Sequence, residues 1–216
     1  IFSSSGESCI AGSRAFVHAS VYEEFKRRLL TGVQALRVGD PASERTQMGP
    51  LVNMGHRATV ERYVQLGRDE GGRVLAGGER PSGALYDKGS YYLPTVIEGL
   101  PNSARMCQEE IFGPVLALLP WSDEADLLAQ CNDNVFGLAS GIWTRDYKTA
   151  WRIGRALQTG TVWINTYKLF SVSTPFGGVK MSGTGREKGR LGILEYTAQK
   201  SFYWGTNESP MPWALS

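Results

Sequence analysis

The segment Leu138-Ala139-Ser140-Gly141-Ile142-Trp143-Thr144 begins the pattern that decides the fold class of this 216-residue chain. Its short apolar run predicts a strand, and residues 147–158 predict a helix that ends at Gly160. Residues 161–165 predict a second strand directly afterwards. Because strands separated by a helix are typical of βαβ units, we expect the two strands to run parallel.

The same alternation of apolar strands and amphipathic helices extends over the rest of the chain. Further strands are predicted at residues 14–18, 73–76, 91–97 and 115–121, and further helices at residues 21–36, 54–69 and 123–132. Ser20 and Glu23 have the spacing of a capping box at the start of the first of these helices. The pattern predicts an α/β fold in which helices flank a mainly parallel sheet.

A long loop follows the predicted strand at residues 161–165. Ligands of parallel sheets bind beyond the carboxyl ends of the strands, and Asn165 stands at such an end. The Gly-rich residues 166–192 then form a connection longer than most structureless loops. We therefore expect this loop to carry function.

Composition is that of an ordinary globular protein, with 42% hydrophobic residues, 20% charged residues and a net charge of +2. Charges of one sign form no long block, so we expect neither nucleic acid nor an anionic membrane as a partner. No apolar run approaches the length of a membrane span, and the first residues lack signal-peptide features. These features predict a cytoplasmic protein.

The three cysteines, Cys9, Cys107 and Cys131, have no metal-type spacing. Only two histidines, His18 and His56, could join them, so no metal site is expected. An odd number of cysteines fits reduced thiols better than a disulfide framework.

Cys9 stands in a context that suits a nucleophile, within Phe2-Ser3-Ser4-Ser5-Gly6-Glu7-Ser8-Cys9-Ile10-Ala11-Gly12-Ser13-Arg14. A thiolate can attack an aldehyde carbonyl to form the tetrahedral intermediate that hydride transfer requires. Gly6 allows a tight backbone turn, and the N–H of Cys9 can then stabilise the developing oxyanion. The alternative for a single cysteine is a small apolar core residue.

Two further segments accompany the Cys9 segment. The first is Gln108-Glu109-Glu110-Ile111-Phe112-Gly113-Pro114-Val115, and the second joins residues 160–165 to residues 175–187. Their order, their spacing and their residues resemble the signatures of the aldehyde dehydrogenase superfamily. The resemblance extends from Phe2 to about Lys200.

The resemblance implies an oxidoreductase that converts a small-molecule aldehyde into a carboxylic acid with NAD or NADP. Cys9 matches the catalytic nucleophile of the family. Glu110 matches the carboxylate that binds the ribose hydroxyls, Phe112 matches the residue bordering the nicotinamide, and His56 matches a position near that ribose. We expect these three residues to bind the cofactor, although a surface histidine is an equal alternative for His56.

The same comparison implies a substrate tunnel. Phe170 and Phe176 match aromatic residues that line it, and Ile10 would narrow its inner end. Lys168 falls at the tunnel mouth, where a cation could attract a semialdehyde that carries a carboxylate. The alternatives are core packing for the phenylalanines and a solvated loop position for the lysine.

Domain organisation follows from the resemblance. Residues 1–193 would be an N-terminally truncated catalytic domain, and residues 194–216 would be a C-terminal oligomerisation strand and tail. An assembly into a homodimer or homotetramer would cover Trp204 and Trp213. The family's dinucleotide-binding domain, general-base Glu and oxyanion Asn would precede Ile1, so we expect a fragment that is nearly inactive alone.

Two alternatives remain open. A relative that acylates coenzyme A would use the same nucleophile and lack the general-base Glu. A non-catalytic remnant would keep the fold and lose the reactivity of Cys9.

Overall fold

The computed structural model describes residues 1–206 and 208, and it is built around a four-stranded sheet in the order β1-β4-β3-β2. Its strands are β1 (Arg14–His18), β2 (Arg73–Ala76), β3 (Thr95–Glu98) and β4 (Val115–Trp121). Strand β4 pairs in parallel with β1 and β3, and only the edge strand β2 is antiparallel. The predicted α/β fold with a mostly parallel sheet is confirmed.

Strand β4 is apolar along most of its length because both of its faces are covered. Val115, Ala117 and Leu119 point to the core on one side. Leu116 and Leu118 point to a second core on the other side. This alternation is the period of two that a strand imposes on its side chains.

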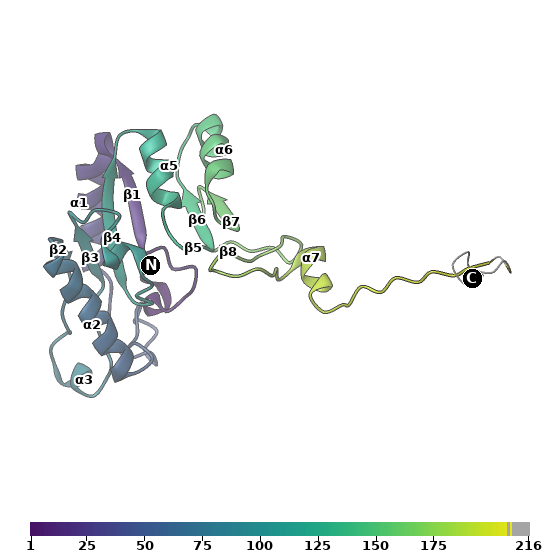
Figure 1. The fold of residues 1–216 in the computed structure, drawn as a ribbon. Coiled ribbons are helices and arrows are strands. Elements are labelled where there is room, and N and C mark those ends of the chain that lie inside the picture. Colours follow the sequence, from purple (N-terminus) through teal and green to yellow (C-terminus); the bar gives the residue numbers. More distant parts are fainter. Residues whose placement is uncertain (207, 209–216) are drawn as a thin grey trace.

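Two helices cover the two faces of the sheet (Figure 1). Helix α2 (Met54–Asp69) supplies Val60 and Val64, both fully buried, to the core around Val115. Helix α1 (Tyr22–Gln34) supplies Val33 to the core around Leu116. The bounds predicted for α2 are those observed.

The predicted capping box at the start of α1 is wrong. Val21 is the N-cap residue of α1, and its side chain makes no capping hydrogen bond. Ser20 lies instead in a 3-10 turn, η2 (Ala19–Val21), where its hydroxyl contacts Nδ1 of His18 at 2.7 Å. Glu23 pairs with Lys26. The Ser20 hydroxyl therefore contacts the His18 imidazole and does not cap α1.

The strand predicted at residues 91–97 is shorter than expected. Tyr91 and Tyr92 are buried, but the sheet ladder begins only at Thr95. Pro94 precedes it and has no N–H to donate to the ladder.

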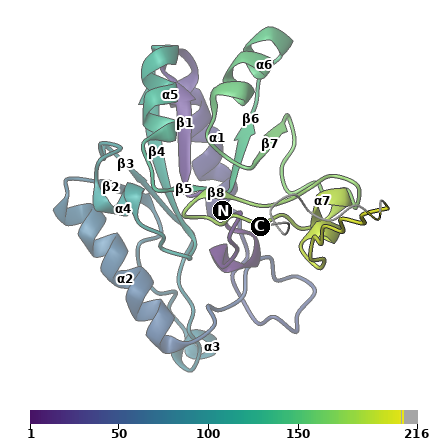
Figure 2. The same cartoon turned by 45° about the vertical axis from the view of Figure 1, so that its right-hand side comes forward.

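The predicted βαβ unit is confirmed, with shorter elements. Strands β6 (Ala139–Ile142) and β7 (Thr161–Ile164) pair in parallel, and α6 (Tyr147–Ala156) connects them. Helix α5 (Glu124–Asn132) precedes the unit, and the Asp123 side chain caps it by accepting the N–H of Asp126. Figure 2 shows α5 and α6 rising on the same side of the molecule.

The long loop predicted after β7 contains structure. Strand β8 (Val179–Lys180) pairs antiparallel with β5 (Phe136–Gly137), and α7 (Gly189–Leu194) begins before the loop was expected to end. The remaining short elements are η1 (Ser3–Gly6), α3 (Ala84–Asp87) and α4 (Arg105–Gln108).

After α7 the described chain runs away from the body of the molecule (Figure 1). Residues 197–206 have no assigned helix or strand, and Phe202, Tyr203 and Trp204 are at least 83% exposed. Pairing of this segment with a neighbouring subunit stays a prediction. Of residues 207–216, which complete the predicted tail, the structure describes only Glu208, so Trp213 lies outside the described residues.

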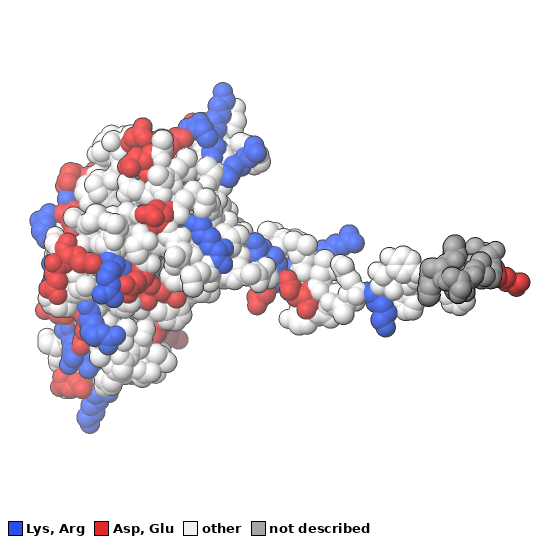
Figure 3. Space-filling view, in the orientation of Figure 1, with Lys and Arg blue, Asp and Glu red and all other residues white. Residues whose placement is uncertain are grey.

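Charges of both signs are interspersed over the face seen in Figure 3. Within residues 1–206 and 208, no helix is long and apolar enough to span a bilayer.

Arg14, at the start of β1, joins the central sheet to α5. Its guanidinium donates to Oδ1 of Asn102 at 2.5 Å and to the carbonyls of Gln130 and Cys131 at 3.1 and 3.2 Å. These carbonyls belong to the last turn of α5, where no intrahelical donor is available.

We predict that Arg14→Leu lowers the free energy of unfolding by about 2 to 3 kcal/mol, because it leaves several polar groups without a partner in a half-buried site. Urea unfolding of the chain measures this change. The control is Arg152→Leu, which removes an exposed ion pair with Glu124 and should cost less than about 1 kcal/mol. Equal losses in the two variants would contradict the role of Arg14.

Candidate active site

Cys9 lies at the surface in a tight turn between η1 and β1. The N–H of Ala11 donates to the carbonyl of Ser8 at 2.8 Å and closes this turn around Cys9 and Ile10. Within the described residues, the N–H of Cys9 has no hydrogen-bond acceptor. The turn therefore presents a thiol and a free backbone donor together.

The turn is held by a backbone approach that only glycine permits. Gly6 has a φ of 75°, and a Cβ added there would lie 2.3 Å from the carbonyl carbon and oxygen of Gly113. The Cys9 segment thus packs directly on the segment that contains Glu110 and Phe112. The preceding Ser5 is buried and donates its hydroxyl to the carbonyl of Gly49 at 3.0 Å.

Glu7, His56 and Phe112 form a connected group beside the turn. The carboxylate of Glu7 accepts the N–H of Val52 at 3.0 and 3.1 Å and lies 3.7 Å from Nε2 of His56. That Nε2 is 2.7 Å from the carbonyl of Phe112. Since a carbonyl only accepts, Nε2 carries the proton in this contact. His56 is therefore next to a predicted cofactor residue.

Glu109 and Glu110 are adjacent in sequence and differ in their contacts. Glu109 pairs with Arg105 and accepts the hydroxyl of Tyr63 at 2.8 Å, and these hydrogen bonds lower its pKa. Glu110 is exposed and has no hydrogen bond or ion pair within the part of the chain that the structure describes. Of these two residues, Glu110 is the one whose carboxylate is available to a ligand.

Phe170 and Phe176 belong to one aromatic cluster. Their ring centroids lie 5.2 Å apart, and Phe170 packs edge-to-face on Trp163 at 5.5 Å. Trp163 in turn contacts Tyr167 at 4.8 Å, and the Tyr167 hydroxyl donates to the carbonyl of Ile10 at 2.8 Å. Through this chain of contacts the predicted tunnel residues connect to the Cys9 turn. Ile10 itself is buried.

Two lysines lie in the same loop region as these aromatic rings. Lys168 follows Tyr167 directly, is half-buried and has a φ of 59°. Lys188 places its Nζ 4.1 Å from the ring centroid of Phe170. This is the range of a cation–π contact, so one face of Phe170 is occupied by a positive charge.

Cys107 and Cys131 differ from Cys9 in burial. Burial raises the pKa of each of these two thiols to about 11. Over residues 1–206 and 208, no group of three or more His, Cys, Asp or Glu side chains is placed to hold a metal ion.

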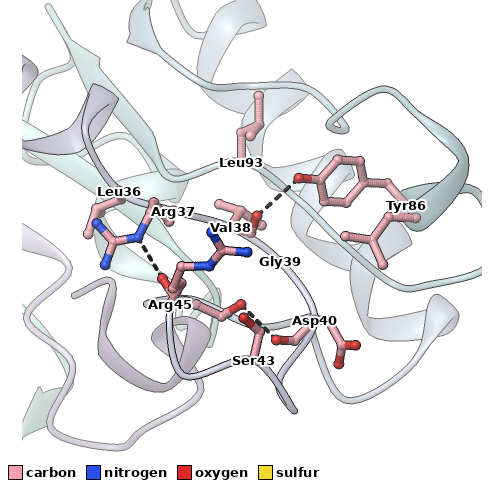
Figure 4. Close-up of a pocket in the computed structure, with 11 residues that line it drawn as sticks. Leu36, Arg37, Val38, Gly39, Asp40, Ser43, Arg45, Tyr86 and Leu93 are labelled. Atoms are coloured by element: carbon pink, nitrogen blue, oxygen red, sulfur yellow. Dashed lines mark hydrogen bonds between the residues drawn. The ribbon is translucent and has the colours of Figure 1, made fainter.

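A cavity of about 580 Å³ lies away from the predicted site residues, between the loop after α1 and helix α3. Figure 4 shows the Tyr86 hydroxyl directed at the carbonyl of Val38, 3.0 Å away. The lining contains none of Cys9, Glu110 or Phe176.

Sequence reasoning missed Glu7 as a partner of His56, and it missed Tyr167, Trp163 and Trp143 around the aromatic cluster. Glu7 could have been found as the acid two residues before Cys9. Tyr167 could have been found from its place two residues beyond Asn165, where a strand ends.

Comparison with known proteins gives one family. Residues 1–202 match the profile described as "Aldehyde dehydrogenase family". Betaine aldehyde dehydrogenase of Brucella anthropi is 41% identical over 97% of this chain and 43% of its own length. That of Bacillus subtilis is 36% identical over 99% of this chain and 44% of its own length.

Solved structures with a similar fold include further aldehyde dehydrogenases. Betaine aldehyde dehydrogenase of Staphylococcus aureus in complex with NAD+ superimposes with a TM-score of 0.94 at 35% identity, over 97% of this chain and 42% of the other. HpcC of Thermus thermophilus gives a TM-score of 0.89 at 42% identity, over 92% and 39%.

The chain spans less than half the length of these relatives. Within that span, the profile match and the shared fold support the same family. The chain belongs to the aldehyde dehydrogenase family.

Proposed function

We propose that this chain supplies the nucleophile, part of the cofactor site and the substrate tunnel of an NAD(P)-dependent aldehyde dehydrogenase. The observation that carries the proposal is the Cys9 turn, which presents an exposed thiol beside an unpaired backbone N–H. We assign the general base that activates water to none of the residues described above.

In the proposed reaction, the Cys9 thiolate attacks the aldehyde carbon and forms a sulfur–carbon bond. The carbonyl oxygen becomes an oxyanion, which the N–H of Cys9 is free to stabilise. The product of this step is a hemithioacetal. After its oxidation to a thioester, attack by water releases the carboxylic acid and returns the thiol to Cys9.

The residues on the cofactor side fit a nicotinamide dinucleotide. The unpaired, exposed carboxylate of Glu110 suits ribose hydroxyls, which donate hydrogen bonds. Phe112 is 40% exposed, so its ring can border a planar ligand. Nε2 of His56 donates a hydrogen bond to the backbone carbonyl of Phe112. NAD+ or NADP+, when bound, would accept the hydride. The NAD+ complex of the Staphylococcus aureus relative supports NAD+ as the cofactor.

For the substrate, the charges near the aromatic cluster favour a neutral or anionic aldehyde. The relatives from Brucella anthropi and Bacillus subtilis are named for betaine aldehyde, whose trimethylammonium group is a cation. Such groups bind to open aromatic faces. Here Lys188 occupies a face of Phe170, and Lys168 adds a second positive charge in the same region. We therefore do not transfer the relatives' substrate to this chain.

The first test is the reactivity of the three thiols toward iodoacetamide at pH 8. We predict that Cys9 is alkylated at least about 100-fold faster than Cys107 or Cys131, because burial raises the pKa of those two to about 11 and removes their thiolate. Mass spectrometry of the labelled peptides gives the rates. A Cys9 rate no higher than that of N-acetylcysteine would favour a non-catalytic remnant.

The second test is turnover by the complete encoded polypeptide. Cys9→Ala should reduce aldehyde oxidation, followed by NADH absorbance, by at least about 1,000-fold, since burial raises the pKa of Cys107 and Cys131 to about 11 and leaves neither as a thiolate that could replace Cys9. Cys131→Ala is the matched control and should retain activity. Retained turnover in Cys9→Ala would refute the assignment of the nucleophile. If acyl transfer required coenzyme A, the acylating alternative would replace hydrolysis.

The third test concerns the charge of the substrate. In the complete polypeptide, Lys168→Ala should lower kcat/KM for a dicarboxylic semialdehyde by about fivefold, leave benzaldehyde unchanged and raise kcat/KM for betaine aldehyde. Lys148→Ala, which removes an equal charge from the exposed face of α6, is the control. The same change for all three aldehydes would contradict a role for Lys168 in selecting charge.

A further inference from the structure

Tyr167 makes a hydrogen bond that joins two segments 157 residues apart. Its hydroxyl donates to the carbonyl of Ile10, the residue after Cys9, at 2.8 Å. Burial raises the pKa of this hydroxyl, which therefore keeps its proton and remains a donor.

The acceptor of this hydrogen bond belongs to a peptide group that is fixed at both ends. The peptide between Ile10 and Ala11 gives its N–H to the carbonyl of Ser8 within the turn. Its carbonyl receives the Tyr167 hydroxyl from outside the turn. Because Cys9 lies inside the turn, fixing this peptide also limits the direction of the Cys9 N–H.

The ring of Tyr167 is held in place. It lies 6.1 Å from Trp143 in a stacked arrangement and 4.8 Å from Trp163. Gly141 makes the room for it, since a Cβ at that position would lie 2.8 Å from Cδ2 of Tyr167 and 2.7 Å from Trp143. A ring packed in this way can hold its hydroxyl in one position.

The backbone that carries Tyr167 is also anchored. Asn165 directly follows β7 and has a φ of 53°, and its side-chain amide exchanges two hydrogen bonds with the backbone of Thr144, at 2.9 and 2.8 Å. These bonds tie the chain just beyond β7 to the chain just beyond β6. The βαβ unit thereby sets the position of Tyr167.

We propose that Tyr167 is a positioning residue for the Cys9 turn, whose hydroxyl holds the Cys9 N–H in the direction of the oxyanion. The inference rests on the proposed function, because an oxyanion forms only if Cys9 attacks a carbonyl. An N–H that points away from the oxyanion stabilises the transition state much less, because oxyanion stabilisation depends on donors that are already oriented before the reaction.

The test compares two reactions of Cys9 in the chain itself, measured on the Cys9 peptide by mass spectrometry. p-Nitrophenyl acetate acylates the thiolate: a sulfur–carbonyl bond forms, the ester bond breaks and p-nitrophenolate leaves. This reaction passes through an oxyanion. Alkylation by iodoacetamide displaces iodide from a saturated carbon and forms no oxyanion, so it reports thiol access and ionisation alone.

We expect Tyr167→Phe to lower the acylation rate constant about tenfold and to change the alkylation rate constant less than twofold. The matched control is Tyr86→Phe, which removes a hydroxyl donated to the Val38 carbonyl at 3.0 Å, remote in sequence and away from Cys9. It should change neither rate. Thermal unfolding of both variants checks the fold.

Equal losses in the two rate constants, or no loss in acylation, would overturn the proposal, because either result assigns Tyr167 a structural role only. Aldehyde turnover by the unsubstituted complete polypeptide is measured separately. If that turnover were absent, the proposed function would fail, while the ratio of acylation to alkylation would still report on Tyr167.

Discussion

The close approach of Gly6 to Gly113 is the constraint on which the candidate site depends. With a Cβ at residue 6 only 2.3 Å from the Gly113 backbone, any other residue would push the Cys9 segment away from the segment of Glu110 and Phe112. The sheet fixes the second segment, because Val115 begins β4 two residues after Gly113. The Cys9 segment is thereby positioned against the start of a central, largely buried strand.

Two parts of the fold contribute to the candidate site: the four-stranded sheet with α2, and the β6-α6-β7 unit. The four-stranded sheet and α2 bring Cys9, His56 and Phe112 together, and the β6-α6-β7 unit contributes the aromatic cluster. Tyr167 connects these parts through its hydrogen bond to the carbonyl of Ile10. At this junction the Cys9 turn lies next to the aromatic cluster, and the Lys188 ammonium lies over Phe170 of that cluster.

Charge at the aromatic cluster of this chain bears on the class of substrate. Aromatic rings of a tunnel can select a quaternary ammonium only where their faces are open. The ammonium of Lys188 over Phe170 closes one face and adds repulsion for a cation. Family membership therefore determines the reaction type that we propose, while a few side chains in one loop determine the proposed substrate class.

The sequence by itself determined the features that depend on neighbours along the chain. The bounds of α2 and β4 and the Asp123 cap follow from periodicity and side-chain chemistry. Tertiary structure decided the contacts between distant residues, which no local pattern encodes. In the folded chain the Ser20 hydroxyl contacts His18, and the Tyr167 hydroxyl donates to the carbonyl of Ile10. Glu109 is paired, while Glu110 has no partner among residues 1–206 and 208. These outcomes depend on which surfaces meet when the sheet and helices pack.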